Sequence, residues 1–149
     1  MYFDIFRTIA LAGALLCAPP ALAQSSAALD VVEAMGFMDD YESHADWVVE
    51  AMAEYGLVGT PQSTAKDVTK LQNAMRRDLI EDKFWVATML ALGLEERRST
   101  AELQALRMAL DAGMSIENLP GQVGYAMSQE IYRAMSGSVL VTAMGSQGR

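Results

Sequence analysis

The sequence predicts an all-α protein, a small single-domain bundle of about five helices that follows a cleavable N-terminal signal peptide. Apolar residues recur at spacings of three and four along most of the chain, which is typical of amphipathic helices. No stretch alternates apolar and polar residues for long enough to require a strand. Gly, Pro and Ser/Thr residues divide the chain into segments of helical length, and no internal repeat is present.

The first 23 residues have the layout of a secretory signal peptide. Arg7 precedes an apolar run at positions 9–18, and two prolines and the small-residue sequence Ala-Leu-Ala follow at positions 19–23. An uncleaved membrane anchor would need about 20 continuous apolar residues, and the prolines interrupt this run earlier. We therefore expect cleavage after Ala23, which leaves residues 24–149 as one acidic helical domain in the periplasm or outside the cell, without stable membrane insertion.

Composition limits the chemistry of the mature domain. The one cysteine, Cys17, lies in the signal peptide, so the mature chain is predicted to lack disulfides, thiol nucleophiles and thiolate metal ligands. The formal net charge is −8, and removing one Asp and one Arg with the signal peptide leaves it unchanged. An acidic surface argues against nucleic acid and against anionic lipid as partners, whereas a basic protein or a divalent cation suits it.

Two helices are predicted in the first part of the domain. A short helix, capped by the serines at positions 25 and 26, runs to Met35, and Gly36 suits the left-handed residue that follows a helix. A second helix covers residues 38–55 and ends at Gly56. The segment GLVGTPQS, residues 56–63, is the clearest loop in the chain.

Two capping boxes open the next two helices. In Thr64–Asp67 and in Ser99–Glu102, a hydroxyl residue stands three places before a carboxylate. The first box opens a long helix that we expect to kink near residues 81–82, where the apolar stripe lapses, and to end at Gly93. The second box opens a helix that ends at Gly113.

A last helix is predicted from about Pro120 to Met135, because proline suits the first helical turn. The tail that follows contains the sequence SVLVTAM at residues 138–144. This segment fits a helical turn, a short strand or an oligomer contact, in that order of preference.

The predicted helix 38–55 has two opposite faces when its residues are projected at about 100° each. Its core face carries Tyr41, Ala45, Val48, Met52 and Tyr55, with Met38 and His44 at the edges. Its opposite face carries four carboxylates at spacings of four: Glu42, Asp46, Glu50 and Glu54. From Asp30 to Glu54 there are eight acidic residues and no Lys or Arg.

These four carboxylates allow two interpretations. Like charges at this spacing cost about 0.2–0.5 kcal/mol per pair, so the helix tolerates self-repulsion along this face. One interpretation is a solvated face that keeps an exported protein soluble. The other is a binding site for a basic protein partner, or for the basic residues of a second copy of the chain, which lie mainly at positions 76–77, 83 and 97–98.

Met35, Met38 and His44 are the candidate metal ligands. Met35 and Met38 have the spacing of a soft copper site, although the expected helix end at Gly36 separates them. Met38 and His44 lie about 120° apart around the helix, too far to grip one ion easily. A calcium loop beginning at Asp39 fails as well, because its sixth position, which requires Gly, is His44.

Three aromatic rings raise separate questions. His44, the only histidine, stands one turn after Asp40, whose carboxylate is expected to favour the protonated imidazole. Its predicted role is packing and hydrogen bonding, with pH sensing as the alternative. Phe84 and Trp85 are adjacent, and burying both on one helix face is difficult. We expect one of them in the core and the other against a loop, with an exposed contact residue as the alternative.

The sequence has no recognisable catalytic motif: no Gly-x-Ser-x-Gly, no His-Glu-x-x-His and no phosphate-binding glycine loop. We therefore expect neither catalytic residues nor a cofactor. The predicted function is that of an exported, non-enzymatic protein that binds another protein, as an adaptor, inhibitor or chaperone-like factor, through Glu42, Asp46, Glu50 and Glu54. A metal-handling protein using Met35, Met38 and His44 is the alternative. A hydrolase of an unrecognised kind is the third.

Overall fold

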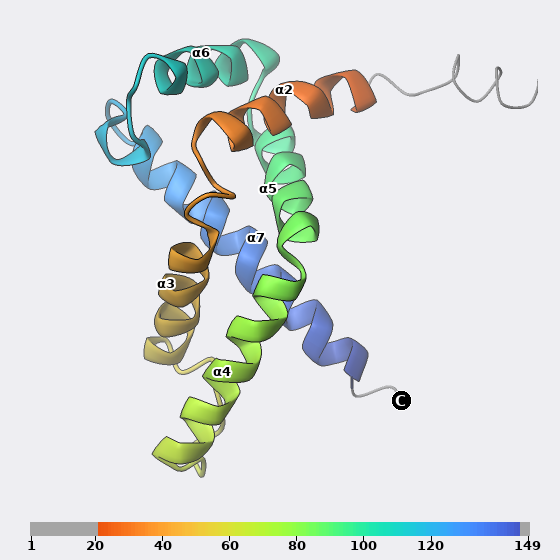
Figure 1. The fold of residues 1–149 in the computed structure, drawn as a ribbon, viewed down its shortest axis with the longest axis vertical. Coiled ribbons are helices and arrows are strands. Elements are labelled where there is room, and N and C mark those ends of the chain that lie inside the picture. The colour runs from red at the N-terminus through yellow and green to blue at the C-terminus, as the bar shows by residue number, and fades with distance from the viewer. Residues whose placement is uncertain (1–20, 147–149) are drawn as a thin grey trace, which may run out of the picture.

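The computed structural model describes residues 21–146, with side chains described for residues 27–140 (Figure 1). The expected signal peptide lies almost entirely outside these residues, so its cleavage after Ala23 stays a prediction. The described part is all-helical: six α-helices and one 3-10 turn form a single small domain without strands. None of these helices combines the length and the apolar character that crossing a membrane requires.

The helices follow one another with short connections. Their bounds are α2 Ala21–Ala34, α3 Tyr41–Glu54, α4 Ala65–Glu81, α5 Lys83–Arg97, α6 Thr100–Asp111, η1 Ile116–Asn118 and α7 Val123–Ser146. Helix α7 is the longest of them, and it packs against α3, α4, α5 and η1. Helix α2 packs against α5 and α6 at one end of the molecule, whereas α3 lies beside α4 toward the other end (Figure 1).

Helix α5 joins these two groups, because it contacts α2 and α6 as well as α7. The core between the helices is apolar and closely follows the stripes expected for amphipathic helices. All six helices and the turn after α2 contribute fully buried side chains, among them Val31, Phe37, Val48, Leu79, Leu94, Leu103, Met127 and Ile131.

The two capping boxes and the helix end before Gly36 are confirmed, whereas the expected cap at positions 25 and 26 is wrong, because α2 already begins at Ala21. The Thr64 hydroxyl accepts a hydrogen bond from the Asp67 amide at 3.3 Å, and the Asp67 carboxylate accepts one from the Thr64 amide at 3.0 Å. Ser99 and Glu102 make the same pair of bonds at 3.3 and 2.7 Å. Gly36 has a φ of 67°, in the left-handed region, as expected for the residue that follows a helix end.

Several predicted boundaries are wrong by a few residues. Helix α3 begins at Tyr41 rather than at Met38, because the Gly36 carbonyl accepts the amides of Asp39 and Asp40 in a turn. The expected kink is a full break at Asp82, with a φ of −94° and a ψ of 11° between α4 and α5. The last helix begins after the Pro120 turn and runs through the tail, so the helical alternative for residues 138–144 is confirmed.

The predicted helix end at Gly93 is wrong, because α5 continues through this residue to Arg97. Gly93 lies where α7 approaches α5. A Cβ atom there would stand 3.4 Å from the Glu130 Oε2 atom of α7. The glycine therefore gives room to a side chain of a neighbouring helix, a role that the local sequence pattern does not distinguish from a helix end.

The two capping boxes provide a test of the local contributions to stability. Thr64→Ala and Ser99→Ala are each expected to lower the free energy of unfolding by about 1 kcal/mol, because an amide at the start of the helix loses its partner. Thr88→Ala is the matched control: this exposed hydroxyl only donates to the Phe84 carbonyl within α5, at 3.0 Å. Its change should stay within about 0.5 kcal/mol. Urea unfolding of the mature chain measures all three, and equal losses would contradict the capping assignment.

Candidate binding surfaces

Helix α3 has the two opposite faces that its sequence predicts. Tyr41, Ala45, Val48 and Met52 are buried, and the Tyr41 hydroxyl donates a hydrogen bond of 2.8 Å to the Leu79 carbonyl of α4. Burial, with a smaller contribution from the Asp82 carboxylate, raises the pKa of this hydroxyl well above its usual value.

The predicted core face of this helix needs two corrections. Tyr55 lies past the last helical residue, where the chain turns at Gly56, and its side chain is 74% exposed. Val49 is buried although it lies outside the predicted stripe. The buried face is wider than one stripe because α3 packs against both α4 and α7.

The four carboxylates Glu42, Asp46, Glu50 and Glu54 are exposed, as predicted. Arg76 of α4 reaches two of them: its Nη2 atom lies 3.4 Å from the Glu42 Oε2 atom, and its Nε atom donates to the Asp46 carboxylate. Glu50 and Glu54 have no ion pair within the described part of the chain. In one half of this acidic face, the single positive charge of Arg76 offsets part of the charge of two carboxylates, whereas the other half has no such partner within the described part of the chain.

The three candidate metal ligands do not converge on one hollow. Met35 and Met38 are partly buried against the core, and Met38 lines a groove between α2 and α5. His44 lines a separate hollow, together with Trp47 and Ile131. Within residues 27–140 there is also no group of three or more His, Cys, Asp or Glu residues placed to hold a metal ion.

His44 is half-buried, and its ring stacks on Phe37 with centroids 5.5 Å apart and an interplanar angle of 18°. Burial lowers the pKa of the imidazole, and this effect outweighs the Asp40 carboxylate, which raises it. Asp40 acts in the expected direction, but the expected net effect is wrong. The neutral imidazole is the favoured form in the folded protein.

This lowered pKa determines how acid should affect stability. Because the unfolded chain binds a proton at His44 more readily than the folded one, the free energy of unfolding should fall as the pH drops from about 6.5 through the lowered folded value. His44→Gln should remove that part of the pH dependence. The chain has a single histidine, so an NMR titration of its imidazole resonances reports this residue alone. A midpoint at or above about 6.5 would contradict the assignment.

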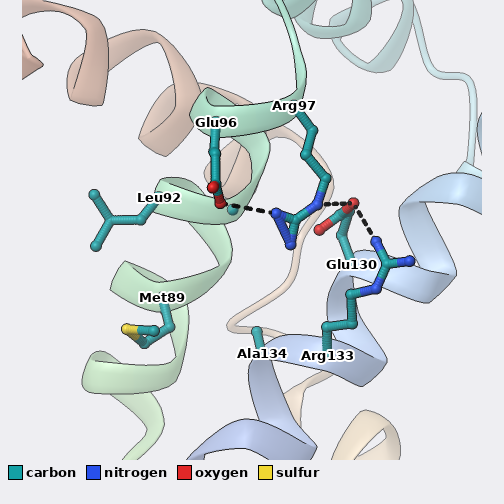
Figure 2. A pocket seen from close by; sticks show the side chains of 8 residues that line it. Met89, Leu92, Glu96, Arg97, Glu130, Arg133 and Ala134 are labelled. Atoms are coloured by element: carbon teal, nitrogen blue, oxygen red, sulfur yellow. Dashed lines mark hydrogen bonds and ion pairs between the residues drawn. The ribbon is translucent and has the colours of Figure 1, made fainter.

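Sequence analysis missed a buried carboxylate on α7. Glu130 is only 6% exposed, and its Oε1 atom lies 3.1 Å from the Arg97 Nε atom of α5 and 3.1 Å from the Arg133 Nη1 atom. Figure 2 shows Glu130 between the two arginines, with Glu96 bonded to the other side of Arg97. Position 130 lies on the same face of the helix as Met127 and Ala134, a signal that would have placed it inside.

We call Glu96, Arg97, Glu130 and Arg133 the Glu130 cluster. This cluster borders a hollow of about 170 Å³, which is also lined by Met89, Leu92 and Ala134. Its charges are balanced: two guanidinium groups face two carboxylates. A carboxylate held by two arginines from two helices is suited to fixing how those helices cross. We assign the cluster a structural role at the contact of α5 with α7.

Removing this charge should therefore destabilise the fold. Glu130→Gln is expected to lower the free energy of unfolding by about 1–2 kcal/mol, because two guanidinium groups lose a charged acceptor while keeping access to water. Glu96→Gln is the control, since it removes an exposed acceptor from the same Arg97, and its effect should stay below about 0.5 kcal/mol. Urea unfolding at neutral pH measures both. If both variants lost the same free energy of unfolding, the burial of Glu130 would not strengthen its ion pairs.

The outer side of α5 carries large apolar side chains that the rest of the fold leaves exposed. We call Phe84, Trp85, Met89 and Leu92 the α5 apolar face. Phe84 is 71% exposed and Trp85 is 55% exposed, so the expectation that one of them lies in the core is wrong. The opposite side of the helix already fills the contacts with its neighbours through Val86, Ala87, Leu90, Ala91 and Leu94.

A groove runs beside this face, between α2 and α5. The α2–α5 groove has a volume of about 490 Å³, and its apolar lining is Leu29, Val32, Met38, Phe84 and Ala87. Two carboxylates, Glu33 and Asp39, complete it. Neither makes an ion pair or a side-chain hydrogen bond within the described part of the chain. The Lys83 Nζ atom stands 5.3 Å from the centroid of the Phe84 ring, so the groove combines exposed apolar surface with two unpaired carboxylates and has one ammonium group near its Phe84 side.

Comparison of the chain with protein-family models, with curated proteins and with solved structures gives no match. The surfaces themselves therefore have to indicate the function. The Glu130 cluster is closed by its own ion pairs. The α5 apolar face and the α2–α5 groove, in contrast, present apolar and acidic groups to solvent.

Proposed function

We propose that this protein is exported and acts without catalysis, by binding a basic protein through the α5 apolar face. The observation that carries the proposal is the exposure of Phe84, Trp85, Met89 and Leu92 on one side of a single helix. Contiguous apolar surface of this kind is a hallmark of interaction sites on proteins that are otherwise polar outside. Aromatic residues and Met are also the types enriched where proteins meet.

The basic character of the partner is supported by charge. The chain carries a formal net charge of −8, and the acidic face of α3 retains two uncompensated carboxylates, Glu50 and Glu54. Charge of this kind speeds the encounter with a basic protein and is screened by salt. Within the proposal, Glu50 and Glu54 attract the partner at a distance, while Glu42 and Asp46 are largely occupied by Arg76.

An exported protein is the setting that the N-terminal sequence favours, and an adaptor, an inhibitor and a chaperone-like factor all fit it. These roles share one requirement: a folded surface that binds a partner without chemical change. The α5 apolar face meets it because its residues lie on a helix whose other side is locked into the core by Val86, Leu90 and Leu94. Such a face is rigid before binding, which lowers the entropy cost of association.

The proposal predicts that binding depends on the outer side of α5. The mature protein is used to capture a partner from an exported fraction, and the partner is then purified and titrated. Trp85→Ala with Leu92→Ala should weaken binding about tenfold or more, because aromatic and aliphatic anchors supply much of the affinity of an interface. Both side chains are about half exposed, so the thermal unfolding temperature should fall only slightly and the double variant should stay folded.

The matched control replaces two large residues elsewhere that are more exposed than Trp85 and Leu92, namely Met108 on α6 and Tyr125 on α7, by Ala. Affinity should then stay within about twofold of the unmodified protein. Equal losses in both double variants, or the failure of the unmodified protein to retain any partner, would refute the proposed function.

A further inference from the structure

We infer that the α2–α5 groove receives a basic amphipathic helix from the partner protein, an inference that rests on the proposed function. Its apolar lining and its two uncompensated carboxylates lie together between two helices and next to the α5 apolar face. The partner helix would place apolar side chains in the groove and Lys or Arg side chains against the carboxylates.

The lining of the groove suits apolar anchors. Leu29 is 42% exposed, so a substantial part of it is available to a partner, while Val32 forms part of the buried wall. Phe84 contributes to both the groove and the α5 apolar face, which makes the two surfaces continuous. A side chain that entered the groove would therefore meet an aromatic ring at its edge and aliphatic groups inside it.

The charge of the groove argues for Lys or Arg in the occupant. Glu33 lies in the last turn of α2, where the negative end of the helix dipole already adds negative potential, and α2 has no basic residue in that turn. Asp39 adds a second carboxylate just beyond it. Both charges stand beside apolar surface, which a docked helix would shield from water. A cation placed there would interact more strongly than one on an open face.

A helix from a different protein fits the groove better than a second copy of this chain. The groove lies between two helices, the geometry in which amphipathic helices dock, and the described residues offer no strand for an extended segment to pair with. Two copies would each bring a formal charge of −8 and repel one another. The chain's Arg76, Arg97, Arg107 and Arg133 are also already paired with its own carboxylates.

The test uses a synthetic peptide of about 18 residues with Leu along one helical face and Lys on the other, a length that spans several turns. The mature protein is titrated with this peptide and with its counterpart carrying Glu in place of Lys. The Lys peptide should bind and the Glu peptide should not. NMR resonance changes should cluster at Leu29, Met38 and Phe84.

Two double variants with the same change in net charge separate the groove from general attraction. Glu33→Gln with Asp39→Asn should weaken binding of the Lys peptide about tenfold, because two charge contacts beside apolar surface are lost. Glu50→Gln with Glu54→Gln removes the same charge from the open face of α3 and should change the affinity less than about twofold. If both double variants lost the same affinity for the Lys peptide, the peptide would be attracted only by the net charge of the protein, and the inference would be overturned.

Three other outcomes would also overturn it. Binding of the Glu peptide as tightly as the Lys peptide would show that the groove has no preference for a basic occupant. Sedimentation that finds dimers of the unmodified protein, lost in the Glu33→Gln/Asp39→Asn variant, would assign the groove to a second copy. If the captured partner still requires Trp85 and Leu92 while the groove variants bind it normally, the groove is wrong and the proposed function stands.

Discussion

The contact between α5 and α7 is the constraint on which the rest of the fold depends. Helix α7 packs against α3, α4 and η1, and α5 packs against α2 and α6, so the two halves of the domain meet where α5 contacts α7. Gly93 supplies the space at that contact, and the Glu130 carboxylate fills it while pairing with one arginine from each helix. A Cβ atom at position 93 would stand 3.4 Å from the Glu130 Oε2 atom, an ordinary contact distance, so this position is filled to contact by the carboxylate.

The same packing explains why aromatic side chains remain outside. Helix α5 is covered on two sides, by α2 and by α7, and close approach of two helices favours small residues such as Ala87, Ala91 and Gly93 between them. Phe84 and Trp85 are left for the outer side. Exposed rings contribute little to the stability of the isolated chain and add to the risk of aggregation, which the net charge of −8 counteracts. Their position is consistent with a surface that is covered when a partner binds.

The features that could be predicted from the sequence are those determined within one or two helical turns. The capping boxes at Thr64 and Ser99 and the helix end at Gly36 depend on bonds between near neighbours, and each is confirmed. The role of Gly93 could not be read in this way, because it depends on Glu130 of α7; the helical spacing of Glu130 indicates its burial, but its pairing with Arg97 depends on α5. The local sequence does not distinguish a glycine inside a helix from a glycine that ends a helix, and the position of the neighbouring helix is needed to decide.

The acidic residues between Asp30 and Glu54 differ in what they can contribute to binding, although in the sequence no Lys or Arg separates them. Arg76 offsets part of the charge of Glu42 and Asp46. Water screens Glu50 and Glu54 on an open helix face, so the charges of α3 act chiefly at long range. Glu33 and Asp39 instead stand beside the apolar lining of the α2–α5 groove. A charge that becomes shielded from water on binding discriminates strongly between a partner that supplies a cation and one that does not. In the proposed complex, selectivity for the partner should therefore arise from Glu33 and Asp39 at the end of α2. The carboxylates of α3 should mainly increase the rate of encounter.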